Sequence, residues 1–154
     1  MACREAFAEQ KVRRDLAILL MTAASGSGRT RKAIAQDAKI HRDALRRILS
    51  GERSASLAEA SSILAACDFD PQLVLVIFIL TDAQQSLEWA ETNIGAFLGE
   101  FLTTLPVALV RELGSGLQEV RPRWAKGSAH RVARLLSDNI KDLERKDPLY
   151  LESV

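Results

Sequence analysis

Apolar residues recur every three or four positions along most of the chain, which is the spacing of the buried face of an α-helix. This spacing predicts helices at about residues 4–24, 31–38, 42–49, 57–66, 71–80, 87–105 and 129–145. Aromatic residues make up only 5% of the chain, whereas Ala, Leu, Arg and Glu are abundant, a mixture that favours helices over strands. The sequence therefore predicts an all-α protein.

One stretch, LVLVIFIL at Leu73–Leu80, is apolar throughout and fits either a buried strand or a buried helix. Its β-branched and aromatic residues suit a strand, but no partner strand is found nearby. Asp70 and Pro71 precede it and match the cap and the first position of a helix. We therefore expect a fully buried helix here.

A longer amphipathic segment forms a packing seam from Leu87 to Leu105. Pro106 is expected to break or kink this helix because proline lacks a backbone N–H. The sequence GAFLG, Gly95–Gly99, has the small-residue spacing that lets helices approach closely. Three nearby glutamates argue against a bilayer: Glu88, Glu91 and Glu100. The segment therefore predicts tight helix packing in a soluble protein, within one chain or across a dimer.

The length of 154 residues, 47% of them hydrophobic, fits one ordinary domain or two small domains that share an interface. The N-terminal stretch carries charges where a secretory signal would be apolar. The longest apolar run is far shorter than the roughly 20 residues that span a bilayer. Cys3 and Cys67 are too few for a disulfide scaffold and are expected to be reduced thiols. We therefore expect a cytoplasmic protein with no membrane partner.

The overall net charge of +1 hides an asymmetry between the two parts of the chain. Residues 1–67 hold 12 Lys and Arg against 7 Asp and Glu, whereas residues 68–154 hold 9 against 13. The first part is basic, with a net charge of +5, and the second is acidic, with a net charge of −4. Only the first part is therefore expected to meet a polyanion.

The basic residues concentrate in TRKAIAQDAKIHRDALRRILSGERSASL, Thr30–Leu57, where two short helices are separated by a tight turn and the second is rich in arginine. The apolar positions of this unit are Ile34, Ala35, Ala38, Ile40, Leu45 and Ile48. A glycine loop and a further amphipathic stretch follow, SGERSASLAEASSILAAC. In these residues the chain resembles the lambda-repressor-like, or Cro/Xre, family of bacterial and phage DNA-binding domains, over about residues 10–80.

The resemblance implies a helix-turn-helix in which Ala35 is small because the two helices cross there, while Ile40, Leu45 and Ile48 lie beneath the crossing. The opposite face of the arginine-rich helix then lies in the major groove. On that face we expect base contacts from Arg42, Asp43, Arg46 and Arg47. Two hydrogen bonds from one arginine to guanine contribute roughly 1–3 kcal/mol of discrimination.

Phosphate contacts are expected where basic side chains lie near helix ends, because both attract phosphate. Arg31, at the start of the second predicted helix, is the leading candidate. The remaining candidates lie near the ends of the same unit: Arg29, Lys32, Lys39, His41, Ser50 and Arg53. His41 is also expected to cap the arginine-rich helix. Lys39 stands where the family usually has glycine, so we expect a positive backbone φ there, at a cost of order 1 kcal/mol.

Other chemistry finds little support in the sequence. Neither His41 nor His130 belongs to a cluster of cysteines or carboxylates, so we expect no metal and no cofactor. No nucleophile, base and orienting group can be selected, so we do not expect an enzyme. Trp89 and Trp124 are expected to anchor a core or an interface, and the sequence identifies no small-molecule effector.

These inferences predict a helix-turn-helix DNA-binding domain at residues 1–80, followed by a helical dimerisation or effector domain at residues 81–154. The expected function is transcription regulation, most simply repression, by a homodimer that binds a palindromic operator in duplex DNA. The segments Leu73–Leu113 and Ala129–Leu143 are expected to hold the dimer together. The alternative is a protein-interaction module, antitoxin-like or anti-repressor, whose helix-turn-helix fold serves for assembly.

Overall fold

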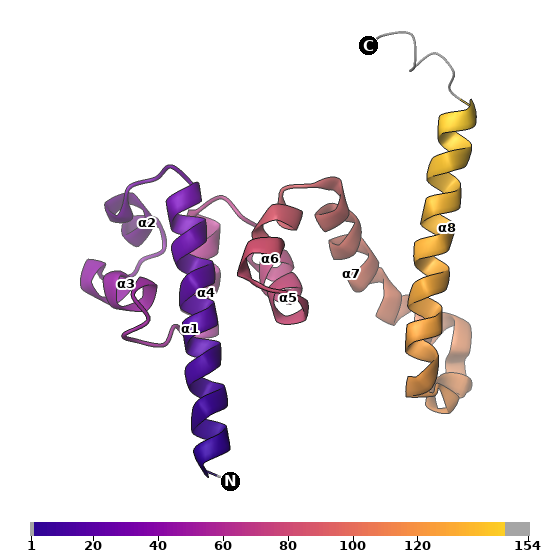
Figure 1. Ribbon diagram of the computed structural model, residues 1–154, viewed down its shortest axis with the longest axis horizontal. Helices are drawn as coiled ribbons and strands as arrows, with labels where there is room; N and C mark the ends of the chain where they lie inside the picture. Colours follow the sequence, from indigo (N-terminus) through magenta and orange to yellow (C-terminus); the bar gives the residue numbers. More distant parts are fainter. Residues whose placement is uncertain (1, 147–154) are drawn as a thin grey trace. The chain divides into compact units, whose positions relative to one another are not determined.

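The computed structural model describes the backbone of residues 2–146 and the side chains of residues 9–142. Over this range the chain is all-α and contains no strand, as the sequence predicts (Figure 1). The helices of this range are α1 (Ala2–Gly26), α2 (Arg31–Asp37), α3 (Arg42–Leu49), α4 (Leu57–Ala66), α5 (Pro71–Leu80), α6 (Ala83–Ala90), α7 (Asn93–Leu113), the 3-10 helices η1 (Gly114–Glu119) and η2 (Pro122–Trp124), and α8 (Ala125–Lys146). The predictions for the side chains of Cys3 and Leu143 lie outside the described residues.

Helices α1 to α6 share one hydrophobic core. α1 packs against α3, α4 and α6, and α2 packs against α3 and α4. Fully burying one large aliphatic side chain stabilises a fold by roughly 1.5–3 kcal/mol. The largest fully buried members of this core are Leu19, Leu20, Ile34, Leu45, Ile48, Ile63, Leu64 and Val74. The core thus holds the two short helices of the basic segment against α1 and α4.

Side-chain caps fix where these short helices begin. Thr30 accepts a hydrogen bond from the Ala33 N–H at 3.2 Å, as predicted for the start of α2. Ser56 and Glu59 form a reciprocal capping box at the start of α4. Asp70 accepts from two backbone N–H groups at the start of α5, and Pro71 occupies its first turn, as predicted. Each such cap contributes about 1 kcal/mol.

The apolar stretch at Leu73–Leu80 is helical, as predicted, but it is not fully buried. Within α5 only Val74 and Ile77 are buried, whereas Ile79 and Leu80 are 78% and 71% exposed. A helix at the edge of a small core presents one face to it, so the remaining apolar residues stay on the surface whatever their type.

The prediction of one helix over residues 87–105 is wrong, because the chain turns between α6 and α7. The N–H and hydroxyl of Thr92 both donate to the Trp89 carbonyl, at 3.0 and 2.8 Å, and end α6. Gly95 then passes so close that an added Cβ would lie 2.1 Å from the Trp89 carbonyl oxygen. The small residues of GAFLG therefore serve packing within the chain. α7 continues through Pro106, so the proline does not break the helix.

The chain divides into two compact units, residues 1–104 and residues 105–154, with the division inside α7. The expected boundary at residue 80 falls inside the first unit. Leu87 of α6 is buried in the first core, and Ala83 and Ala90 pack against that core. α6 thus belongs with the helices before it, because its apolar face completes their core.

The second unit has no buried core of its own: none of its described side chains, at residues 105–142, is buried. Trp124 is 51% exposed, so it anchors no core, whereas Trp89 in the first unit is partly buried. Large apolar side chains of this unit lie in solvent: Leu105, Val107, Leu109, Val110, Leu113, Leu117, Val120, Leu135 and Ile140. An exposed apolar surface of this extent is uncommon in a soluble monomer.

The stretch Asn93–Glu119 is long and apolar enough to cross a membrane by length and composition. Its most apolar 18 residues have a mean hydropathy of 1.5, and 6% of them are buried. Of the three glutamates that argue against a bilayer in the sequence, only Glu100 lies within this stretch, and α7 extends beyond it to Leu113. Composition alone does not distinguish a membrane helix from a helix that a second copy covers.

Candidate nucleic-acid interface

The basic segment consists of α2 and α3 joined by the four residues Ala38–His41. Lys39 has a backbone φ of +56°, the left-handed conformation expected at this position. The N–H groups of Lys39 and Ile40 bond to the carbonyls of Gln36 and Ala35 at 3.2 and 2.9 Å. This pair of bonds forms a Schellman motif, which satisfies the last carbonyls of α2. The turn is thus closed by backbone bonds, although a lysine replaces the usual glycine.

α3 is oriented by its cap and by its buried face. The Nδ1 of His41 accepts from the Asp43 N–H at 3.4 Å, so His41 caps the helix as predicted. Leu45 and Ile48 are 1% exposed, and Ala35 of the neighbouring helix is 2% exposed. The expected burial of Ala35, Leu45 and Ile48 is therefore confirmed, whereas Ile40, also expected to be buried, is only half-buried.

The other face of α3 is open to solvent. Its four polar side chains, all exposed, are Arg42, Asp43, Arg46 and Arg47. Arg42 makes no ion pair with any described residue, so its guanidinium is available to a ligand. Asp43 lies 3.9 Å from the His41 ring rather than beside an arginine. The face therefore combines one unengaged arginine with two further arginines at the other end of the helix.

Arg31 joins this face from the start of α2. Arg31 lines one hollow of about 440 Å³ together with the residue that caps α3 and four residues of α3 itself. These residues are His41, Arg42, Asp43, Leu45 and Arg46. The Arg31 side chain is exposed, and its Nη2 donates a hydrogen bond to the Met21 sulfur at 3.8 Å. The fold thus brings together residues from both short helices that are eleven or more positions apart in the sequence. The hollow concentrates positive charge on one side of the first unit.

The loop after α3 supplies a residue that the sequence analysis missed. Glu52 places one carboxylate oxygen 3.5 Å from Arg46 Nη1 and the other 3.8 Å from Arg47 Nε. Within a helix, side chains pair with neighbours three or four positions away. Glu52 lies in the following loop, and the turn at Gly51, with φ of +75°, brings it back to α3. In the sequence, the signal that could have indicated this ion pair is the glycine at position 51, which lets the chain turn back immediately before the acidic Glu52.

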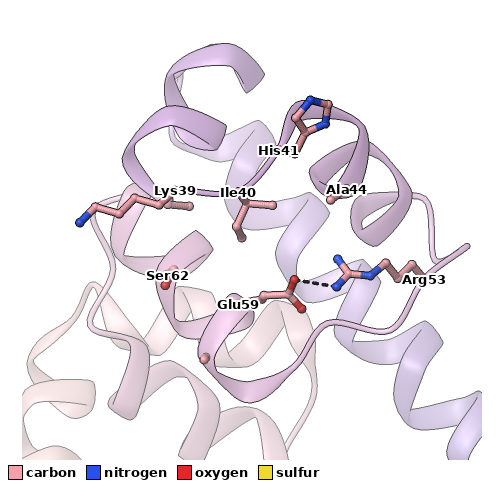
Figure 2. Close-up of a pocket in the computed structure, with 9 residues that line it drawn as sticks. Lys39, Ile40, His41, Ala44, Arg53, Glu59 and Ser62 are labelled. Atoms are coloured by element: carbon pink, nitrogen blue, oxygen red, sulfur yellow. Dashed lines mark hydrogen bonds and ion pairs between the residues drawn. The ribbon is translucent and has the colours of Figure 1, made fainter.

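Arg53 belongs mainly to the loop that connects α3 with α4. Its N–H donates to the Arg47 carbonyl at 3.0 Å, and its Nη2 donates to Glu59 Oε1 at 2.8 Å. Figure 2 shows this ion pair beside a hollow of about 350 Å³, with Lys39 extending away from the pair. The other guanidinium nitrogen of Arg53, Nη1, is buried and has no partner among the described residues.

The carboxyl group of Glu59 has a lowered pKa. The main cause is the hydrogen bond that its carboxylate accepts from the Ser56 backbone N–H, at 2.9 Å. Burial raises the pKa, and the bond from Arg53 lowers it again. The ionised form of Glu59 is therefore the one that holds the loop and the start of α4 together.

Three of the other residues expected to contact phosphate differ in whether their side chains are bonded within the fold or open to solvent. Arg29 is ion-paired with Asp37 and also donates to the Ala66 carbonyl, so its guanidinium ties α2 to the end of α4. Lys32 is exposed on α2. Ser50, exposed at the end of α3, donates its hydroxyl to the Arg47 carbonyl at 3.2 Å. Arg29 is therefore engaged within the fold, whereas Lys32 remains open to solvent.

The candidate interface thus consists of the solvent face of α3, the start of α2 and the loop that follows α3. Comparison of the chain with models of protein families, with curated proteins and with solved structures found no match.

Proposed function

We propose that the protein is a sequence-specific DNA-binding transcription regulator of the lambda-repressor-like type, most simply a repressor. The observation that carries this proposal is the exposed arginine face of α3, joined by Arg31 around a hollow of about 440 Å³. The major groove admits one α-helix and presents guanine edges that an arginine binds with two hydrogen bonds. Arg42 and Arg46 would read bases, and Arg31 would hold a phosphate at the start of α2.

The local geometry supports a helix-turn-helix as the scaffold of this face. The left-handed Lys39 ends α2, and His41 begins α3 two residues later. Ala35, Leu45 and Ile48 are buried beneath the two helices, so their packing fixes which side of α3 faces outward. Arg29 is left out of the proposed interface because Asp37 and the Ala66 carbonyl already hold its guanidinium.

We further propose that the regulator works as a homodimer in the cytoplasm. One recognition helix reads only a few base pairs, whereas two helices placed roughly 34 Å apart read two half-sites of a palindrome. The uncovered apolar side chains of residues 105–142 supply surface for such an assembly. The acidic charge of residues 68–154 would keep this part of the chain away from DNA.

Selection of bound duplexes from a random-sequence library, followed by footprinting on the selected site, tests the proposal. We expect enrichment of a palindromic sequence. Arg42→Ala should relax the preference at one or two base pairs, whereas Arg31→Ala should weaken binding to every sequence and lower the salt slope by about one. Lys141→Ala, which removes an exposed cation from α8, is the control. Absence of any enriched sequence would contradict the proposal.

The uncovered second unit also favours a second candidate, a protein-interaction module in which the helix-turn-helix serves for assembly. Such a module needs no affinity for DNA, so it predicts no enriched duplex and no loss of function in Arg42→Ala. Co-purification of the tagged protein with a single stoichiometric partner, together with a failed duplex selection, would favour this candidate over DNA binding.

A further inference from the structure

The strongest unexplained feature of the interface is the carboxylate of Glu52, which stands between the two arginines at the end of α3. The two contacts, at 3.5 and 3.8 Å, come from different oxygens of the same carboxylate. Glu52 is 51% exposed, and Arg46 and Arg47 are 58% and 53% exposed, so all three side chains are reachable by a large ligand. An exposed ion pair of this kind contributes little to folding.

The backbone position of Glu52 is fixed by hydrogen bonds of the neighbouring loop residues. Gly51 adopts a left-handed conformation, and its N–H donates to the Ile48 carbonyl at 3.0 Å. On the other side, the Arg53 N–H donates to the Arg47 carbonyl at 3.0 Å. The backbone of Glu52 is therefore held near α3 whether or not a ligand occupies the arginines, and this keeps the carboxylate within reach of both guanidinium groups.

A carboxylate beside both arginines affects two kinds of DNA complex differently. In a non-specific complex the arginines contact phosphates, which the carboxylate repels at short range. In a specific complex the arginines reach base edges inside the groove, and a carboxylate that holds their guanidinium groups in place reduces the conformational freedom lost on binding. The same residue thus penalises the wrong sequences more than the right one.

We propose that Glu52 is a specificity-determining positioning residue, which holds Arg46 and Arg47 and suppresses their binding to phosphates in non-specific DNA. This inference rests on the proposed DNA-binding function. It predicts that removing the charge of Glu52 raises the affinity for DNA in general and lowers the discrimination between sequences.

The test compares the full-length wild type with Glu52→Gln, Glu52→Asp and a control, Glu88→Gln. The control removes the same charge from an exposed position on α6, where the side chain contacts Gln84. Two probes are used: a mixed-sequence duplex of about 24 base pairs, and a duplex of the same length selected by the wild type from a random library. Dissociation constants are measured from low to high salt.

We expect Glu52→Gln to bind the mixed-sequence duplex about five- to tenfold more tightly, with a smaller gain or a loss on the selected duplex. The difference from wild type should shrink at high salt, because salt screens exposed charges. Glu52→Asp should lie between wild type and Glu52→Gln, and Glu88→Gln should match wild type. A purely structural role of Glu52 would not produce this dependence on salt.

Equal changes on both duplexes, no change on either, or the same gain in Glu88→Gln would overturn the inference while leaving DNA binding intact. A wild type that selects no duplex at all would overturn the proposed function, and the role of Glu52 with it.

Discussion

At the scale of single residues, one face of α3 packs against the core and the opposite face is exposed to solvent. Leu45 and Ile48 are 1% exposed and hold the helix to the core, whereas Arg42 and Arg46 lie on the surface. A helix of eight residues is too short to be stable alone. Its orientation toward a ligand therefore depends on the buried face.

The first prediction separates these two faces. Leu45→Ala should lower the free energy of unfolding by roughly 2–5 kcal/mol, because it removes buried methyl groups and leaves a cavity. Arg46→Ala should change it by less than about 0.5 kcal/mol, because the side chain is exposed. Denaturant unfolding measures both values. A neutral Leu45→Ala would show that the assignment of faces on α3 is wrong.

The second prediction concerns the stability of the loop between α3 and α4 in acid. The hydrogen bond from the Ser56 backbone lowers the pKa of Glu59 below its ordinary value of 4.5. A carboxyl group with a lowered pKa in the folded state stabilises the protein above its unfolded pKa, and loses this effect as the pH falls through the folded pKa. Glu59→Gln should therefore be less stable than wild type at pH 7, and the gap should shrink below about pH 4.5.

Unfolding free energies between pH 7 and pH 3 check this expectation. Ser56→Ala is the matched comparison, because it removes the capping hydroxyl but keeps the backbone N–H that binds Glu59. Most of its destabilisation should persist in acid. A gap between wild type and Glu59→Gln that stays constant down to pH 3 would contradict the role assigned to the ionised carboxylate.

At the scale of elements, the turn between α6 and α7 depends on the missing side chain of Gly95. A Cβ there would lie 2.1 Å from the Trp89 carbonyl oxygen and 3.0 Å from the Ala90 Cα, both of them backbone atoms that cannot rotate away. The two helices meet at this point because glycine lets the start of α7 approach the end of α6.

The third prediction follows from this contact. Gly95→Ala should destabilise the first unit by roughly 1–3 kcal/mol, the usual cost of overpacking. Gly26→Ala is the control in the same unit, because a Cβ at Gly26 meets nothing within 4 Å. Thermal unfolding of the two variants gives the comparison. Equal melting temperatures for both would show that α6 and α7 separate without penalty.

At the scale of the whole molecule, the first unit has a core and the second lacks one among its described residues. Val107 and Val110, at 69% and 59% exposure, lie one turn apart on α7. Apolar side chains on successive turns form a stripe that a partner helix can cover. The proposed homodimer uses this stripe.

The fourth prediction tests that assembly in the full chain. The double variant Val107→Glu and Val110→Glu should shift the protein from dimer to monomer in light scattering, because two buried carboxylates would have no partner. Leu57→Glu is the control, since Leu57 is 74% exposed in the first unit. A wild type that is monomeric, or that floats with lipid vesicles, would exclude the soluble homodimer.

Much of the fold follows from features that can be recognised in short stretches of the sequence. The spacing of apolar residues predicts helices because one face of each must be buried. Thr30 and Asp70 locate helix starts because their side chains bond to backbone groups only a few residues away. The left-handed Lys39 and the buried Leu45 agree with what the resemblance to a known helix-turn-helix pattern implies.

Other features depend on contacts between residues far apart in the chain. The Arg29 guanidinium donates a hydrogen bond to the carbonyl of Ala66, which lies 37 positions away in the sequence. The turn at Gly95 and the placement of α6 in the first unit depend on which apolar faces find each other, and many pairings suit the same periodic pattern. The sequence by itself therefore determined the helical class, most of the helices in residues 1–80, the caps at Thr30 and Asp70, and the arginine-rich face. Only the tertiary structure decided which cations remain open to a ligand, because burial and ion pairing depend on what folds against them.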